Sequence, residues 1–167
     1  MLKPIGTIDN RIAEDLRKIL SHVFGCPVAI ADNLDIPNRA YHKGRGQYLA
    51  SALLESLKAS GAAGDERVLG IADIDLYAPG LNFVFGQAEP ESGTAVISLC
   101  RLRQELPPDP TLVLNRAAKE AVHELGHTFG LGHCAKARCV MHFSNTLHDT
   151  DVKGMNFCSH CHPKLIQ

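Results

Sequence analysis

The sequence predicts an α/β (α+β) fold, a single domain in which helices cover a mixed, twisted sheet. The chain has 167 residues and 45% hydrophobic content, which suits one domain with a buried core. Segments with the apolar spacing of helices alternate with short apolar runs that are typical of strands. The chain contains neither an internal repeat nor a low-complexity segment.

Two helices are predicted in the first part of the chain. Apolar residues recur at helical spacing from residue 8 to residue 23, with Asp9 placed to cap the start and Gly25 placed to end the helix. Leucines at positions 49, 53, 54 and 57 form the apolar face of a second helix, which we expect to end at Gly61.

Short apolar runs bounded by turn residues predict the strands. Cys26 and Cys100 adjoin two of these runs, so we expect both to be buried thiols. The expected strands cover residues 28–31, a short piece near Tyr41, and residues 68–74, 82–86 and 94–99.

A third helix carries the most informative motif, His-Glu-Leu-Gly-His-Thr-Phe-Gly-Leu-Gly-His-Cys at residues 123–134, after a proline-rich stretch. Two histidines four residues apart lie on one face of a helix, so His123 and His127 can bind one metal ion. Glu124 is rotated away from that pair. This position suits a general base that holds water better than it suits a metal ligand.

The third histidine requires the helix to stop. A helix that continued past His127 would carry His133 roughly 240° around the axis and about 9 Å along it. We therefore expect the helix to end near Gly130, because a glycine with positive φ lets the chain turn and lets His133 return as the third ligand. Three protein ligands leave one position for water, which is typical of a catalytic zinc.

Four cysteines follow the histidines in a CxxxxC and a CxxC pattern separated by eighteen residues, which suits tetrahedral thiolate coordination. The chain after about residue 134 is polar, and so little apolar surface does not offset the entropy of ordering without metal binding. We therefore predict a second, structural zinc, which makes two zinc ions per chain. Its expected ligands are Cys134, Cys139, Cys158 and Cys161.

The sequence resembles the archaemetzincin family. The resemblance rests on residues 123–141, on Cys158-Ser-His-Cys161 and on the upstream stretches 78–86 and 95–102, so it covers most of the chain. It implies a metzincin-like domain with a catalytic zinc on the three histidines, Glu124 as the general base, and a four-cysteine zinc. Met141, two residues after Cys139, is placed where a metzincin has the methionine turn beneath the catalytic metal.

The resemblance also implies how the chain is organised. We expect one domain over residues 1–167, with the sheet, the helices and the zinc helix in 1–133 and the methionine turn and cysteine zinc in 134–167. Residues 82–86 are expected to form an edge strand that lines the cleft and pairs with an extended peptide. Some metzincins have a tyrosine after the methionine turn. Here the last tyrosine is Tyr77, and His142 is the best candidate to face the cleft in its place.

The predicted function is hydrolysis of peptide bonds by zinc-activated water, with a peptide or protein as substrate. The resemblance implies aminopeptidase-like cleavage as one form of this activity. The alternative is a non-catalytic, zinc-stabilised module that binds a peptide in the same cleft. Turnover of a diverse peptide library distinguishes the two.

Charge and hydropathy exclude other classes of function. A net charge of −1, without a cluster of lysine or arginine, is not expected of a nucleic-acid-binding protein. The first residues lack the regions of a signal peptide, and no apolar run approaches the length of a membrane span. We therefore expect a cytoplasmic protein without a nucleic-acid or membrane partner.

Overall fold

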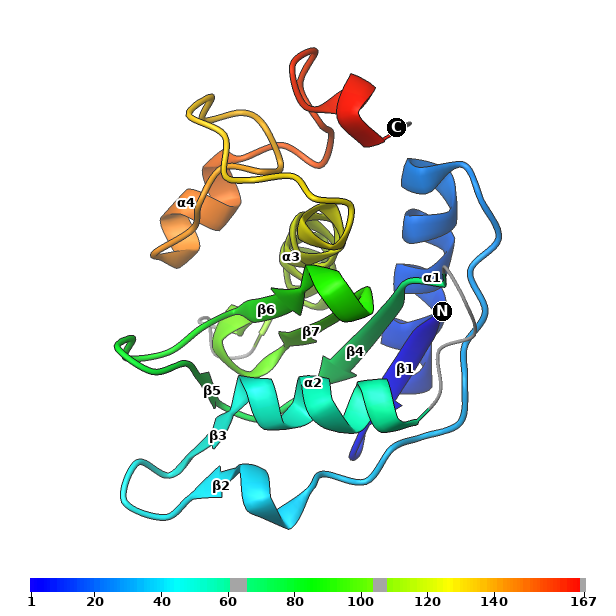
Figure 1. Ribbon diagram of the computed structural model, residues 1–167. Helices are drawn as coiled ribbons and strands as arrows, with labels where there is room; N and C mark the ends of the chain where they lie inside the picture. Colours follow the sequence, from blue (N-terminus) through cyan, green and yellow to red (C-terminus); the bar gives the residue numbers. More distant parts are fainter. Residues whose placement is uncertain (61–65, 104–107, 166–167) are drawn as a thin grey trace.

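The central sheet has four strands in the order β1-β4-β7-β6 (Figure 1). The computed structural model describes residues 1–60, 66–103 and 108–165. Strands β1 (Leu2–Ile5), β4 (Val68–Ala72) and β7 (Thr94–Ser98) are parallel, and β6 (Gly86–Glu89) pairs antiparallel with β7 at one edge. The sheet is therefore mixed, as the sequence predicts.

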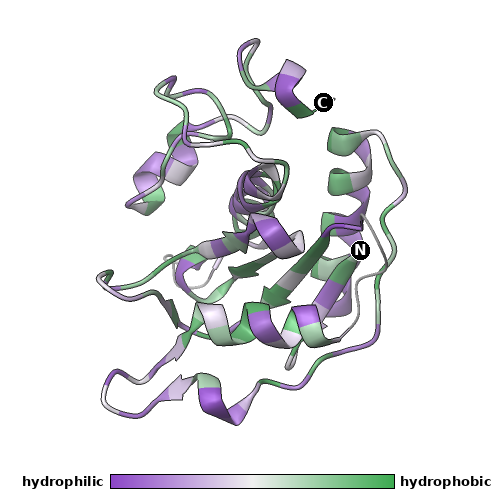
Figure 2. Cartoon of the chain, viewed as in Figure 1, coloured by the Kyte–Doolittle hydropathy of each residue, from purple (hydrophilic) through white to green (hydrophobic). Residues whose placement is uncertain are grey.

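Helices cover both faces of this sheet. Strands β4 and β7 are buried along their whole length, and Figure 2 shows them in the green of hydrophobic residues. Because side chains alternate along a strand, Leu69 and Ile71 pack with α1 (Asn10–Phe24) and α3 (Pro110–Thr128), whereas Val68 packs with α2 (Ala50–Ala59) on the opposite face. The zinc-motif helix α3 thus lies directly on the sheet.

A second, smaller sheet has the strand order β2-β3-β5. It consists of β2 (Tyr41–His42), β3 (Gln47–Leu49) and β5 (Leu76–Tyr77). Arg45, between β2 and β3, donates hydrogen bonds from Nη2 to the carbonyl oxygens of Leu81 at 3.0 Å and Asn82 at 2.9 Å. The small sheet therefore holds the segment that leads into β6.

The three predicted helices are confirmed. Helix α1 begins after Asp9, whose carboxylate accepts a hydrogen bond from the backbone N–H of Arg11 at 2.9 Å, and it ends at Gly25 with φ of 65°. Helix α2 follows the predicted leucine pattern, and its expected end at Gly61 lies outside the described residues. The strands predicted near Tyr41 and at 68–74 and 94–99 are confirmed as β2, β4 and β7.

Two predicted strands are wrong. Residues 28–31 lie beside β1 but form only one isolated bridge, Leu2 with Ile30, because Pro4 has no N–H with which to extend the ladder. Ile30 is 40% exposed, so this run is not the predicted buried strand. Residues 82–85 are not in a strand, because the N–H of Val84 donates to the carbonyl of Leu76 in the smaller sheet. The edge strand begins only at Gly86.

The two cysteines outside the predicted zinc sites also differ from expectation. Cys26 is exposed and Cys100 is partly exposed, so neither is the buried thiol that the adjoining apolar runs indicated. Cys26 lies directly after Gly25, where the chain has left helix α1 and has not yet reached the sheet.

The segment after residue 133 packs on the far side of α3 and contains a short helix, α4 (Leu147–Val152), that the sequence did not predict (Figure 1). Thr146 and Asp149 form a capping box at its start. Arg116 of α3 donates two hydrogen bonds of 2.7 Å to the Asp151 carboxylate. Polar contacts therefore attach this segment to the zinc-motif helix.

A fully buried ion pair lies beside these contacts. Lys153 is 1% exposed as a residue, and its Nζ is 3.0 Å from Oε1 of Glu120 on α3, whose side chain is 3% exposed. The angle of approach is poor for a hydrogen bond, so the contact is an ion pair. The same Oε1 accepts a hydrogen bond of 2.7 Å from the Thr150 hydroxyl.

No helix within the described ranges combines the length and the apolar character that crossing a bilayer requires.

Candidate metal centre

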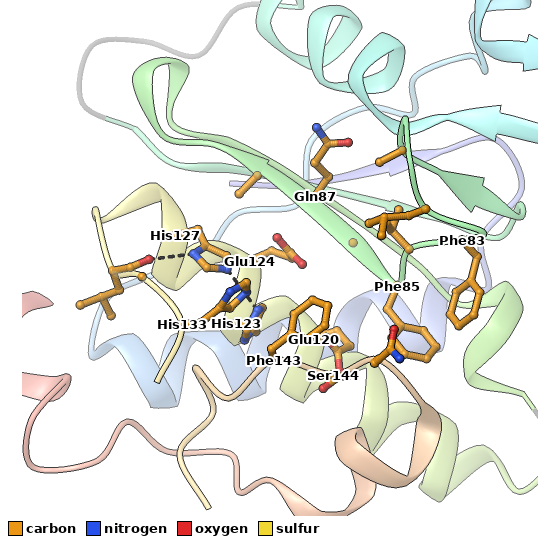
Figure 3. Close-up of a pocket in the computed structure, with 18 of the residues that line it drawn as sticks. Phe83, Phe85, Gln87, Glu120, His123, Glu124, His127, His133, Phe143 and Ser144 are labelled. Atoms are coloured by element: carbon orange, nitrogen blue, oxygen red, sulfur yellow. Dashed lines mark hydrogen bonds between the residues drawn. The ribbon is translucent and has the colours of Figure 1, made fainter. Parts of the chain in front are cut away.

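The three histidines of the motif converge in space (Figure 3). Helix α3 ends at Thr128, and Gly130 with φ of 81° turns the chain so that His133 returns toward His123 and His127. One ring nitrogen from each histidine lies within 4.8 Å of the others. The predicted end of the helix and the predicted return of the third histidine are both confirmed.

Backbone carbonyls fix the tautomers of two of these histidines. Nδ1 of His123 donates to the carbonyl of Val140 at 2.8 Å, and Nδ1 of His127 donates to the carbonyl of Leu131 at 2.7 Å. Both Nε2 atoms therefore carry lone pairs, and they face each other at 3.1 Å. Two acceptors this close repel each other unless a cation lies between them.

The imidazoles are neutral at neutral pH. Burial, followed by the charge of Lys153, lowers the pKa of His123 to about 2. Burial likewise lowers the pKa of His127 and of His133. Neutral imidazole is the form that binds a metal ion.

Glu124 lies between the histidines and strand β6, and its side chain reaches the cleft (Figure 3). Burial raises the pKa of this carboxyl to about 8, the nearby charge of Glu120 contributes in the same direction, and Lys153 opposes both. The carboxyl is thus placed beside the histidines in a setting that favours its uptake of a proton.

A cleft of about 790 Å³ opens beside the histidines. Its walls are α3, the segment 78–88 with the edge strand β6, the turn at 130–133 and residues 143–145. Phe143 is 48% exposed, and the centre of its ring lies 4.9 Å from that of His133. The expectation for His142 is wrong, because its Nδ1 is directed to the carbonyl of Cys134 at 3.0 Å and the next residues line the cleft instead.

Two cleft residues were not predicted as part of the site. The apolar pattern of the third helix places Glu120 on the same side as His123 and His127, but it does not show that Glu120 reaches the cleft. Phe143 had no such signal, since it lies in an irregular segment whose path is set by contacts distant in the sequence.

Met141 lies under helix α3 and is fully buried. Its sulfur packs against Gly126, directly before His127, where a Cβ atom would overlap with the thioether and with the ring of Phe157. The N–H of Cys134 donates to the carbonyl of Met141 at 2.9 Å. Gly126 therefore provides the space that brings this methionine close to the histidines.

The four predicted cysteines form a second cluster, with their sulfur atoms within 4.8 Å of one another. The Sγ atoms of Cys134 and Cys158 are 3.8 Å apart, close to the roughly 3.8 Å between two sulfurs that each lie about 2.3 Å from a tetrahedral zinc. Backbone N–H groups, first that of His160, lower the pKa of Cys158 to about 6, whereas burial raises the pKa of Cys161 to about 12. The chemistry of these donors fits a structural metal site.

The two clusters share one short stretch of backbone, because His133 and Cys134 are adjacent. On an α/β scaffold, a histidine cluster with a buried carboxylate beside it is the arrangement of zinc metallopeptidases, and the fold and the site assign the chain to that class.

Comparison with known proteins identifies the family of zinc metallopeptidases to which the chain belongs. The model of peptidase family M54 matches residues 10–167. The archaemetzincin of Methanocaldococcus jannaschii is 43% identical over 167 residues, which cover 98% of this chain and 90% of the relative. The chain therefore belongs to the archaemetzincins, peptidase family M54, and is a zinc metallopeptidase.

Solved structures agree with this assignment. The crystal structure of the archaemetzincin from Methanopyrus kandleri has a TM-score of 0.84 and 44% sequence identity, covering 99% of this chain and 92% of that one. A zinc-dependent peptidase from Methanocorpusculum labreanum has a TM-score of 0.88 and 29% identity, covering 99% of this chain and 100% of that one.

Proposed function

We propose that His123, His127 and His133 bind a catalytic zinc and that Glu124 is the general base for hydrolysis of peptide bonds. The observation that carries this proposal is the pair of Nε2 lone pairs 3.1 Å apart. Two nitrogens that each lie about 2.0–2.1 Å from a tetrahedral zinc are roughly 3.3 Å apart, so these imidazoles stand almost where the ion needs them. His133, on its separate turn, completes the donor set.

When bound, zinc acidifies a water molecule and polarises the carbonyl group of the scissile peptide bond. Glu124 accepts the proton of the attacking water and then donates it to the amine that leaves. Burial raises the pKa of this carboxyl, which favours its uptake of the proton. The carbonyls of Val140 and Leu131 hold His123 and His127 in the tautomer that keeps Nε2 directed at the ion.

The substrate in this proposal is an extended peptide that pairs with the free edge of β6. Strand β6 lies at the edge of the sheet, and its residues from Gly86 to Ala88 line the cleft. Backbone hydrogen bonds to such an edge hold a peptide with little dependence on its side chains. Residues 143–145, after the methionine turn, supply the wall for a single side-chain pocket.

The second part of the proposal is a structural zinc on Cys134, Cys139, Cys158 and Cys161, which makes two zinc ions per chain. The carbonyl of Val140, between Cys139 and Met141, also orients His123, so the loop that carries the methionine turn reaches both metal sites. The division of the domain at residue 133 belongs to the same proposal: the core forms most of the cleft, and the later segment carries the methionine turn, the cysteine site and the wall at 143–145.

The test uses Glu124→Gln, with Glu14→Gln as the matched control, because Glu14 is a partly exposed carboxylate of α1 that does not line the cleft. We expect mass spectrometry of the native protein to find two zinc ions in the wild type and in both variants. We expect kcat to fall about 10²–10⁴-fold in Glu124→Gln alone, since the change removes the base and no ligand. Full activity in Glu124→Gln would refute the assignment.

The form of cleavage is tested with matched peptides. Aminopeptidase-like cleavage, which is part of the proposal, requires a free α-amine, so acetylation of the first residue should abolish product release. Equal cleavage of acetylated and free peptides indicates an endopeptidase instead. Zinc-loaded protein that cleaves no member of a diverse library favours the peptide-binding module.

A further inference from the structure

Gly86 of strand β6 lies against Glu124 so closely that no side chain fits between them. A Cβ atom on Gly86 would lie 2.6 Å from Cγ and 2.9 Å from Oε1 of Glu124, and 2.7 Å from the carbonyl oxygen of Val96. Real Cβ atoms essentially never approach another heavy atom within 3.0 Å. Gly86 is not among the glycines with positive φ, so the backbone conformation does not explain the glycine. The lack of space for a Cβ atom therefore explains why this residue is glycine.

The two neighbours of that space differ in their freedom to move. The Val96 carbonyl belongs to β7, which is bonded on both sides, to β4 and to β6. The Glu124 side chain is the neighbour that can move, because among the described residues no hydrogen bond or ion pair fixes its carboxylate. Packing against the bare backbone of β6 is therefore what sets the position of this carboxylate.

We propose that Gly86 is a positioning residue for Glu124, leaving the space in which the carboxylate lies against the edge strand while it faces the cleft. This inference rests on the proposed role of Glu124 as general base. Strand β6 then has two roles next to Glu124. The strand pairs with the peptide, and Gly86 holds the base beside the peptide bond that is cleaved.

The test measures kcat of Gly86→Ala and compares the effect of Gly86→Ala on Tm in the wild type and in Glu124→Ala. Alanine at position 86 should push the carboxylate away from its place and lower kcat about 100-fold, with KM little changed and the zinc content unchanged, since a displacement of about 1 Å costs about that much in rate. Glu124→Ala removes Cγ and the carboxylate, whereas the Val96 carbonyl oxygen stays, so Gly86→Ala should lower Tm less in this background than in the wild type.

Gly70→Ala on β4 is the control for strain in the sheet. A Cβ atom there would lie 2.8 Å from side-chain atoms of Ile5 and Leu57, which do not line the cleft, so this variant should lose stability and keep its kcat. If Gly86→Ala is itself unstable, Glu124→Ala should recover part of the lost Tm, because it removes the overlap with Glu124 and leaves the overlap with the Val96 carbonyl.

Two results would overturn the inference. The first is wild-type kcat in Gly86→Ala, and the second is an equal loss of Tm when Gly86→Ala is added to the wild type and to Glu124→Ala. Activity retained in Glu124→Gln would instead overturn the proposed function, whereas loss of activity in Glu124→Gln together with full activity in Gly86→Ala refutes the positioning role alone.

Discussion

The buried ion pair between Lys153 and Glu120 gives a quantitative prediction. The Lys153 side chain is 0% exposed and that of Glu120 is 3% exposed, so neither charge is stabilised by water. Lys153→Met keeps much of the volume and removes one charge, which leaves the Glu120 carboxylate buried without its partner. Breaking such a pair costs about 3–5 kcal/mol of the free energy of unfolding. For a domain of this size the corresponding fall in Tm is roughly 6–20 °C.

The assay is thermal unfolding with zinc in excess, followed by circular dichroism. Lys58→Met is the matched control, because Lys58 pairs with Glu89 at 3.8 Å with side chains 63% and 43% exposed, and such a pair contributes at most about 1 kcal/mol. The double variant Lys153→Met with Glu120→Gln should recover most of the loss, since a neutral amide still accepts the hydrogen bond from Thr150.

Two outcomes contradict this reasoning. A Tm for Lys153→Met within about 2 °C of the wild type would mean that water reaches the pair. A double variant as unstable as Lys153→Met would mean that the lysine stabilises the fold through packing of its aliphatic chain and not through its charge.

Three further predictions concern the metals and acid stability. His133→Ala should lower the zinc content from two ions to one while unfolding stays cooperative, because the proposed cysteine site remains; global unfolding would show that the roles of the two metals are reversed. Cys158→Ser with Cys161→Ser should also lose one zinc, should become sensitive to limited proteolysis after about residue 134, and should lose activity although neither residue lines the cleft. An unchanged digestion pattern with two zinc ions would refute this. The hydrogen bonds from Arg116 lower the pKa of Asp151, so the pair stabilises the fold above the ordinary pKa of an aspartate, and the stabilisation is lost as the pH falls through the lowered pKa. In Tm measurements from about pH 7 to about pH 3, Asp151→Asn should remove this part of the acid-induced loss, and parallel curves for the two proteins would contradict it.

The sequence predicted those features whose cause lies within a short stretch of chain. Helix α1 carries its own cap at Asp9 and its own stop at Gly25. The proposed histidine ligands follow from spacing, since a helical turn and one glycine are enough to bring the three histidines together. The class of fold followed from the alternation of helical and strand patterns.

Features that depend on distant partners could not be predicted in this way. An apolar run does not show whether it will extend a ladder, so residues 28–31, which form one bridge with β1, and residues 82–85, which lie before β6, were both predicted as strands. The polar contacts of residues 150–153 with α3 join residues 30 to 35 positions apart in the sequence. Asp151 and Lys153 look like surface charges until the helix that they contact is known.

The close packing of Met141 under Gly126 has a consequence for the chemical durability of the protein. A thioether becomes a sulfoxide only when an oxidant reaches the sulfur, and here Met141 is fully buried with its sulfur against Gly126. Met141 should therefore be oxidised only while the segment around it is open. The rate of Met141 oxidation then reports how often that segment opens.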